Sequence, residues 1–518
     1  IACTNVLTLI LGRASDRGAE IAVRTALGAG RARLVQLFVA EAVALVVVGA
    51  TVGAFMAAWS LAGLRILDPG GIPRLGGAEL GPPVFAFLAV ASVAVAALLG
   101  FAPTLFVERS GIAASLRGGR GITTRQRLRQ MLVVSQVALA AVLLIGGGLL
   151  FRSLREVLSV DPGFNPENVL TAHIQRPGPF VGTDFAEDIA FYRNLAERVS
   201  GLPGVVSVAA AYQDPTSPGW NNSFRFATGP QDKETLFGSI FRPVTPGYFA
   251  TNGIRVLQGR EFTSADDAES VGVVIVNQAF VRRHFGEEDP LGHRLHYGDF
   301  WQARPPEYEI VGVVNDVRSA GLTSVVRPTT YFPHAQQPVR EMTLTVKAAG
   351  NPLLLAGPIR QAVHDIDPTL PVDDIALMEE RLAGTEAARR FLTILIASFS
   401  TIAALLAAVG IYGVLAFMVT RRRREIGVRM AVGARPQAVV HLVLSQATWL
   451  VVVGLTVGLV ASVFATRLLE RFLFQVSTVD PWTYIWVTLF LGGAAVVAAT
   501  IPARRAIRID PMEVLRTE

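Results

Sequence analysis

Two stretches of this 518-residue chain decide its architecture, because each repeats the other. Residues Glu20–Gly53 read EIAVRTALGAGRARLVQLFVAEAVALVVVGATVG, and residues Glu425–Gly458 read EIGVRMAVGARPQAVVHLVLSQATWLVVVGLTVG. The two stretches align without a gap, and 18 of their 34 positions are identical. A shared apolar composition alone does not keep a glutamate, an arginine and three glycines in register, so the pattern indicates an internal duplication.

The match continues beyond the next apolar run. Pro103, followed by a Leu-Arg pair, recurs as Pro502 with a Leu-Arg pair at the same spacing. Residues 1–120 therefore repeat residues 391–518, but only the second repeat is preceded by a further apolar run and a long polar segment. We expect a tandem pseudo-dimer truncated at its N-terminus, whose first unit retains only its last three helices.

Long apolar runs indicate a membrane protein. The chain is 51% hydrophobic and 17% charged, with a mean hydropathy of +0.44, whereas soluble proteins are about 25% charged. A helix crosses a bilayer with about 20 apolar residues. We expect a polytopic α-helical membrane protein of about seven transmembrane helices, the first truncated, from these runs: Ile1–Gly12, Ala42–Leu64, Val84–Val107, Met131–Phe151, Phe391–Val419, Ala447–Leu468 and Trp482–Ile501.

The arginines predict the orientation of the chain. They gather after the first, third, fifth and last runs, whereas the connections 65–83 and 469–481 are short and nearly balanced in charge. Arg-rich loops stay in the cytoplasm. We therefore expect a cytoplasmic C-terminus and a folded external domain over residues 152–390. The net charge of the chain is +6. Because the arginines lie beside apolar runs, we expect them to interact with the surface of the lipid bilayer, not with nucleic acid.

The predicted external domain has a different pattern, with short alternating segments punctuated by proline and glycine. Such segments are typical of strands, and 3.6-residue periodicity is typical of helices. We predict an α+β domain. The predicted strands are Val205–Ala211, Gly272–Val276, Tyr308–Val314 and Met342–Val346, and the predicted helices are Phe185–Leu202 and Leu353–Asp367.

Candidate catalytic and metal-binding residues are few. The single cysteine, Cys3, excludes a disulfide framework and a thiolate metal site. We interpret three histidines and a short acidic run as surface residues, because no H-E-x-x-H or G-x-S-x-G motif accompanies them: His284, His293, His296, Glu287, Glu288 and Asp289. Neither lysine, Lys233 or Lys347, lies in a P-loop. We therefore expect no catalytic residue, metal or cofactor, and ATP-driven motion would need a separate subunit.

Polar residues within the apolar runs are few as well. Gln136, Glu41 and its repeat counterpart Gln446 are the candidates, and the latter two lie at predicted helix starts. Ionisable side chains inside a membrane are costly and usually functional. No succession of acidic residues crosses the runs, which argues against a proton-coupled carrier.

The segment that opens each repeat has a specific pattern. In Arg422-Arg-Arg-Glu-Ile-Gly-Val-Arg-Met-Ala-Val-Gly-Ala434, Glu425 and Arg429 are four residues apart, which suits an ion pair on one face of a short surface helix. This block and the C-terminal Pro502-Ala-Arg-Arg-Ala-x-Arg-x-Asp-Pro-Met-Glu-Val-Leu-Arg516 resemble the FtsX/MacB-type ABC permeases. Val244-Thr-Pro-Gly-Tyr-Phe249, Val274-Ile-Val-Asn277 and Asp289-Pro-Leu-Gly292 resemble the MacB-like periplasmic core domain. That resemblance implies two subdomains, of which the second is inserted around residues 220–300. The duplicated layout resembles the tandem permeases often called the acidobacterial duplicated-permease group.

The resemblance implies a function for each segment. It implies that the segment after the second helix of each unit is a coupling helix that docks on a separate cytoplasmic ABC ATPase, and carried over by position these residues are Glu20, Arg24, Gly28, Glu425, Arg429 and Gly433. The implied domains are residues 1–120, the last three helices of the first unit; 121–151, a linker and the first helix of the second unit; 152–390, the periplasmic core domain; and 391–518, the last three helices of the second unit.

The function that the resemblance implies is that of a permease subunit in an export or mechanotransmission system, acting on a periplasmic substrate or partner. It also implies a location in the bacterial inner (plasma) membrane, with the external domain in the periplasm. The alternative is an FtsX-like regulator whose external domain controls a cell-wall hydrolase. A periplasmic adaptor or such a hydrolase is accordingly a candidate partner, and the chain is not expected to be an enzyme.

Overall fold

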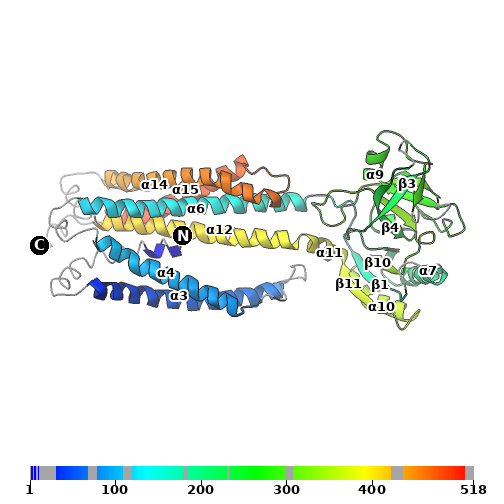
Figure 1. Cartoon of the computed structure of the whole chain (residues 1–518), viewed down its shortest axis with the longest axis horizontal. Coiled ribbons are helices and arrows are strands. Elements are labelled where there is room, and N and C mark those ends of the chain that lie inside the picture. Colours follow the sequence, from blue (N-terminus) through cyan, green and yellow to red (C-terminus); the bar gives the residue numbers. More distant parts are fainter. Residues whose placement is uncertain are drawn as a thin grey trace. The chain divides into compact units, whose positions relative to one another are not determined.

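The computed structural model describes residues 31–67, 79–108, 120–178, 185–229, 234–297, 307–421 and 436–507, with positions 2, 3, 5–7, 10, 77 and 231. These residues form two compact units. The helical unit is drawn from residues 1–68, 73–156 and 389–518, and the sheet unit from residues 157–388. Figure 1 labels the helices and strands of both units.

The helical unit contains the long apolar helices. Six helices in the described part of the chain are apolar and long enough to cross a membrane. They confirm the six longer runs predicted from the sequence; the first run is described only at some positions, and a seventh helix stays a prediction. The helices are α3 (Arg31–Leu67), α4 (Pro82–Glu108), α6 (Arg120–Leu158), α12 (Ala387–Arg421), α14 (Pro436–Ala465) and α15 (Pro481–Ile507).

Four of these helices, α6, α12, α14 and α15, share one apolar core that is rich in alanine and valine. Small residues let the helix backbones approach closely. At Gly147 of α6, an added methyl group would lie 2.8 Å from the Ser400 hydroxyl oxygen of α12. That hydroxyl donates to the Leu143 carbonyl of α6 at 2.7 Å, so α6 and α12 are joined by packing and by a polar contact.

Helices α3 and α4 pack mainly against each other. Figure 1 shows them side by side, in blue. Gly100 of α4 lies against Val39 of α3, where an added methyl group would be 2.8 Å from a Val39 methyl carbon. Only 11% of the apolar window of α3 and 17% of that of α4 is buried, against 56% for α6. The described residues therefore leave most of the surface of this pair uncovered.

The boundaries of the helices follow the sequence repeat. α3 begins at Arg31 and α14 at Pro436, which are aligned positions of the repeat. α4 and α15 are both 27 residues long, and they begin and end at positions with the same offset as Pro103 and Pro502.

The sheet unit is built on one mixed sheet, in which eleven strands are described. Ten lie in the order β11-β1-β10-β2-β4-β3-β7-β8-β6-β9, and β5 pairs with β8. The strands are β1 (Val169–Gln175), β2 (Val205–Ala211), β3 (Trp220–Phe226), β4 (Phe237–Val244), β5 (Val256–Gly259), β6 (Val273–Asn277), β7 (Arg294–Tyr297), β8 (Glu307–Val314), β9 (Thr329–Pro333), β10 (Glu341–Ala348) and β11 (Val372–Leu377).

The sheet has two parts, joined where Ala211 of β2 pairs with Val244 of β4. One part contains β1, β2, β10 and β11, and the other contains β3 to β9. The predicted insertion at residues 220–300 was too short. It extends from Trp220 to Pro333, because β8 pairs with β6 and β7, and β9 pairs with β4 and β6.

Short helices cover the sheet, and the predicted α+β class is confirmed. All four predicted strands are present as β2, β6, β8 and β10, and the two predicted helices as α7 and η2–α10. α7 buries Phe191, Leu195 and Val199 at helical spacing against the main core. The helices are α7 (Ala186–Ser200), α8 (Tyr248–Thr251), α9 (Gln278–His284), η2 (Pro352–Leu355), α10 (Ala356–His364) and α11 (Met378–Thr385).

Candidate functional site

The predicted ATPase-coupling residues cannot be placed, because they lie outside the described residues: Glu20, Arg24, Gly28, Glu425, Arg429 and Gly433. The helices that follow these segments are described. They are α3 and α14, which begin at equivalent positions of the repeat.

Two helices carry the chain between the helical unit and the sheet unit. α6 ends at Leu158, among the first residues of the sheet unit, and α12 begins at Ala387, among its last. Any displacement that passes along the backbone between the two units must pass through these connections. We therefore describe the contacts of α6 and α12 in each unit as the candidate site.

In the helical unit, one loop binds both helices. This segment, 472–480, begins at the last residue of the 3-10 helix η3 (Thr466–Phe472) and is named here the helical-unit loop. Its Phe474 backbone N–H donates to the Ser153 hydroxyl of α6 at 2.8 Å. Its Phe472 carbonyl accepts from the Arg389 guanidinium of α12 at 3.2 Å. The loop therefore holds α6 and α12 through residues only two positions apart.

The same loop ends in an ion pair with α6. The Asp480 carboxylate accepts from Arg152 at 2.6 Å with one oxygen. With the other it accepts from the backbone N–H and hydroxyl of Thr483, at 2.9 and 2.7 Å. Asp480 thus caps the N-terminus of α15, whose first residue is Pro481. An aspartate cap followed by proline at the first helical position favours the start of a helix. Burial raises the pKa of Asp480, but the hydrogen bonds from Thr483 and Arg152 outweigh it and lower the pKa below its usual value.

In the sheet unit, one loop again receives both connections. This loop, Asn315–Ser324, lies between β8 and β9 and is named here the sheet-unit loop. Its Arg318 backbone N–H donates to the Pro162 carbonyl at 2.9 Å, and its Asn315 side chain donates to the Gly163 carbonyl at 2.8 Å. Both acceptors lie just after α6, so the connection from α6 is fixed to this loop by two hydrogen bonds.

The connection to α12 reaches the same loop through Glu386. This buried residue lies directly before α12, and its carboxylate accepts from the Leu322 backbone N–H at 3.0 Å. Gly321, beside it, has a φ of +101°, a conformation that glycine adopts readily. Burying a carboxylate without hydrogen-bond donors costs free energy. The hydrogen bond from Leu322 therefore favours the observed position of the sheet-unit loop beside Glu386.

The sheet-unit loop is anchored to the sheet by Asp316. The Asp316 carboxylate accepts from the Asn277 side chain at 3.0 Å and from the Ala279 backbone N–H at 2.7 Å. Asn277 ends β6 and caps α9, accepting from Phe280 at 3.0 Å. The loop is therefore joined to β6 on one side and to the connections of α6 and α12 on the other.

Gln136 is buried within the helical unit, as its position in an apolar run predicted. Its side-chain amide N–H donates to the side-chain oxygen Oδ1 of Asn5 at 2.7 Å, and the side-chain Nδ2 of Asn5 donates to the backbone carbonyl of Leu406 in α12 at 2.7 Å. Asn5 was not among the predicted polar residues, although an asparagine in the first apolar run is a visible signal. Glu41 is partly buried, and the side chain of Gln446 lies outside the described residues.

The histidines do not form a metal site within the described residues. His284, predicted at the surface, is instead buried on α9 among Phe280, Phe237 and other aromatic rings. Burial lowers the pKa of His284 to about 4, and Arg283 contributes to the lowering. His293 and His296 lie at a turn and in β7, not on one helix face, because β7 pairs with β3 and β8.

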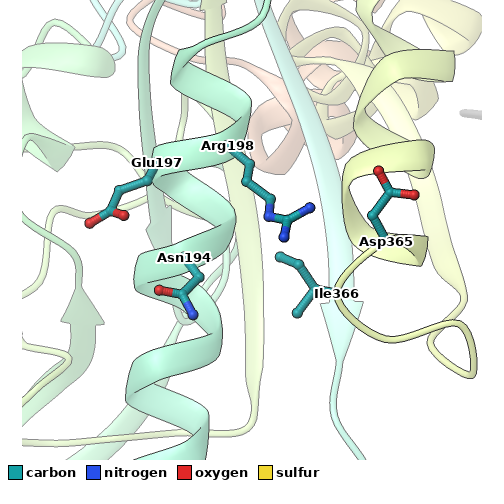
Figure 2. A pocket seen from close by; sticks show the side chains of 5 residues that line it. All are labelled: Asn194, Glu197, Arg198, Asp365 and Ile366. Carbon is teal, nitrogen blue, oxygen red and sulfur yellow. The ribbon is translucent and has the colours of Figure 1, made fainter.

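A polar hollow lies between α7 and the segment after α10 (Figure 2). Its lining residues are Asn194, Glu197, Arg198, Asp365 and Ile366. These side chains include no nucleophile with an adjacent base, so the hollow suggests no reaction.

The contacts of α6 and α12 were missed by sequence reasoning. Asp480-Pro481 is a recognisable helix start, and Arg152 directly follows an apolar run, so both carried a local signal. Glu386 and Asn315 carried none, because their roles depend on partners 64 and 152 residues away in the chain.

Two family models match the chain. Residues 397–511 match "FtsX-like permease C-terminal", and residues 132–356 match "MacB-like periplasmic core domain". Among solved structures, the periplasmic region of MacB from Actinobacillus actinomycetemcomitans is 16% identical, with a TM-score of 0.30 over 43% of this chain and 94% of that one. The extracellular domain of YknZ from Gram-positive bacteria is 16% identical, with a TM-score of 0.28 over 40% of this chain and 100% of that domain.

Curated relatives include transporter proteins. The "Uncharacterized ABC transporter permease YknZ" of Bacillus subtilis is 24% identical over 340 residues, 64% of this chain and 81% of YknZ. The "Macrolide export ATP-binding/permease protein MacB 2" of Aeromonas hydrophila is 25% identical over 303 residues, 55% of this chain and 44% of that protein. The "Pyoverdine export ATP-binding/permease protein PvdT" of Pseudomonas entomophila is 26% identical over 417 residues, which are 75% of this chain and 56% of PvdT. The chain thus spans about half the length of the last two. The chain is thus similar to FtsX-like permeases over residues 397–511 and to the MacB-like periplasmic core domain over residues 132–356, and its described residues include six helices that are long and apolar enough to cross a membrane.

Proposed function

We propose that this chain is the permease subunit of an ABC-type export or mechanotransmission system, moved by a separate cytoplasmic ATPase. It would act on a periplasmic substrate or partner. The observation that carries the proposal is that one loop in the helical unit binds α6 and α12, and one loop in the sheet unit binds the segment that follows α6 and the residue that precedes α12.

The two loops explain how motion would pass along the chain. α6 and α12 are single helices of 39 and 35 residues. Sliding one helix against the other would break hydrogen bonds to a common loop, so small displacements move both together. The sheet-unit loop would then transfer the displacement to β6 through Asp316. In this account the substrate is handled by the external domain.

The ATPase would bind the two segments that precede α3 and α14. Their key residues in the second unit are Glu425, Arg429 and Gly433, and in the first unit Glu20, Arg24 and Gly28. The repetition of a charged pattern next to a long apolar helix supports this assignment, since a positive loop alone needs no fixed order of glutamate, arginine and glycine.

We also infer that the chain contains a tandem duplication. Seven helices and the domains 1–120, 121–151, 152–390 and 391–518 follow from that inference, and the Arg-rich segments between the apolar runs support a cytoplasmic C-terminus. Equal starts of α3 and α14 and equal lengths of α4 and α15 support the duplication.

Co-purification in detergent tests the proposal. A tagged chain should recover a cytoplasmic ATPase, and the double substitution Glu425→Lys with Arg429→Glu should reduce that recovery at least tenfold. The matched control reverses Arg193 and Glu197, which have the same spacing on exposed positions of α7, and should leave recovery unchanged. Absence of any ATPase from the wild-type preparation would overturn the proposal. Recovery of a cell-wall hydrolase would favour the FtsX-like regulator.

A further inference from the structure

Two side-chain amides lie buried inside the helical unit, among apolar residues. Gln136 of α6 is 1% exposed, and Asn5 of the first apolar run is 8% exposed. The Gln136 side chain donates to Oδ1 of Asn5 at 2.7 Å, and Nδ2 of Asn5 donates to the Leu406 carbonyl of α12 at 2.7 Å. Burying an amide without a partner costs free energy, so these hydrogen bonds favour holding the first run, α6 and α12 together at this point.

A glycine of α12 makes room for the two amides. A methyl group added to Gly410 would lie 2.7 Å from Oδ1 of Asn5 and closer still to Oε1 of Gln136. Gly410 lies one helical turn after Leu406, whose carbonyl can accept from Asn5 as well as within α12, because a backbone carbonyl oxygen has two lone pairs. A side chain at position 410 would therefore displace both amides.

The sequence repeat places Asn5 and Gly410 at equivalent positions. Asn5 lies fifteen residues before Glu20, and Gly410 lies fifteen residues before Glu425. Two equivalent residues thus meet inside the helical unit, and they are complementary, since one carries an amide and the other has no side chain. Asparagine at both positions would collide with Gln136, and glycine at both would remove the acceptor that Asn5 provides. The divergence of the repeats at this position favours a specific polar contact over general apolar packing.

We propose that Asn5 and Gln136 form a polar anchor that fixes the first apolar run to α6 and α12, and that transmits displacement of the first coupling segment to these two helices. The anchor itself is inferred from the contacts described above, and its part in transmission rests on the proposed function. Asn5 and Gln136 are positioning residues in this account.

The polar anchor would give the two predicted coupling segments a common target. The second segment, which contains Glu425, follows α12, so its displacement would reach α12 along the backbone. The first segment, which contains Glu20, follows the first apolar run, and Asn5 would pass its displacement sideways to α6 and α12. Because α6 and α12 lead to the sheet unit, both segments would act on the same external domain.

The distance between two nitroxide labels measures whether the first run is fixed. One label is placed on Cys3, the single cysteine of the chain, and the other on a cysteine that replaces Ile394, which is 62% exposed on α12. Pulsed electron paramagnetic resonance of the chain of residues 1–518 in lipid nanodiscs should give one narrow distance distribution. Gly410→Ala should at least double its width, because the added methyl displaces both amides. The matched control is Gly413→Ala on the same helix, where an added methyl meets no atom of the described residues within 4 Å.

Substitution of the amides separates positioning from folding. Asn5→Leu with Gln136→Leu should broaden the distance distribution as Gly410→Ala does. Replacing both partners of a buried hydrogen bond by apolar groups of similar size is nearly neutral for stability, so the midpoint of thermal unfolding should change little. The exchange Asn5→Gln with Gln136→Asn keeps two amides of the same combined length and should restore the narrow distribution.

The complex with a co-purified ATPase tests transmission through the polar anchor. Asn5→Leu with Gln136→Leu should leave ATPase recovery unchanged but reduce the ATP-dependent change in hydrogen exchange at the Leu322 amide at least twofold. The control is Ser398→Leu with Thr401→Leu, two exposed hydroxyls of α12 that donate to carbonyls of their own helix.

Equal widths of the distance distribution in the Gly410→Ala and Gly413→Ala chains would overturn the polar anchor. A full ATP-dependent change at Leu322 in the Asn5→Leu/Gln136→Leu chain would overturn its part in transmission. Absence of any co-purified ATPase would contradict the proposed function instead, and the nitroxide distances would still decide whether the anchor exists.

Discussion

At the residue scale, Asp480 combines two roles that substitution can separate. It accepts from Thr483 as the cap of α15 and from Arg152 as an ion-pair partner. Asp480→Asn should keep most of the cap and lose the ion pair, whereas Asp480→Ala should lose both. Loss of a cap costs about 1 kcal/mol, so the alanine variant should have the lower midpoint of thermal unfolding in detergent. Identical midpoints for the two variants would show that the cap contributes nothing.

His284 predicts a pH dependence of the sheet unit. Its pKa is lowered to about 4 in the folded chain by burial and by Arg283, while an unfolded histidine titrates near about 6.5. Between these values the unfolded chain binds a proton that the folded chain does not, so the free energy of unfolding falls as the pH falls from about 6.5 to about 4. The slope is about 1.4 kcal/mol per pH unit at most. The buried His334, whose pKa is also lowered to about 4 by burial, adds to it.

Thermal unfolding of the sheet unit between pH 7 and pH 4.5, followed through near-ultraviolet circular dichroism, measures this dependence. His284→Phe should weaken the pH dependence, because phenylalanine suits the surrounding aromatic rings and does not titrate. The exposed His364→Phe is the control. An unfolding midpoint in the wild type that does not change over this interval would contradict the assignment.

At the element scale, the connection after α6 depends on Gly163. Its φ is +83°, and an added methyl group would lie 1.9 Å from the Asp316 carbonyl oxygen in the sheet-unit loop. Gly163→Ala should therefore destabilise the sheet unit by about 1 to 3 kcal/mol. Gly204→Ala is the matched control, because Gly204 has a φ of +88° but no atom of the described residues within 4 Å of an added methyl. Equal losses in thermal stability would mean that backbone strain alone, not the contact with the loop, explains the effect.

The elements were more predictable from the sequence than their contacts. Apolar length and period define helices and strands locally, which is why β2 was predicted with its observed bounds, Val205–Ala211. The extent of the inserted part was not predictable in this way, since the pairing of β4 with β9 joins residues about ninety positions apart. Polar contacts such as that between Glu386 and Leu322 depend on the assembled loop and leave no periodic pattern.

At the scale of the whole molecule, the two sequence repeats differ in how far other helices cover them. Helices α14 and α15 of the second repeat share one apolar core with α6 and α12. The described residues leave most of α3 and α4, the corresponding helices of the first repeat, uncovered. The predicted coupling segments precede α3 and α14, and α6 and α12 lead to the external domain. If ATP hydrolysis by a partner ATPase displaces the predicted coupling segments, the effect should be measurable in the sheet unit.

Hydrogen exchange of the sheet-unit loop tests this central claim most directly. The complex of the chain with its co-purified ATPase is placed in lipid nanodiscs, and exchange is compared with and without ATP. The Arg318 and Leu322 amides, which donate to Pro162 and Glu386, should change their protection when ATP is hydrolysed, and Glu386→Gln should reduce the change at Leu322. If the complex hydrolyses ATP while these amides keep the same protection, the account of motion transmitted through α6 and α12 is contradicted.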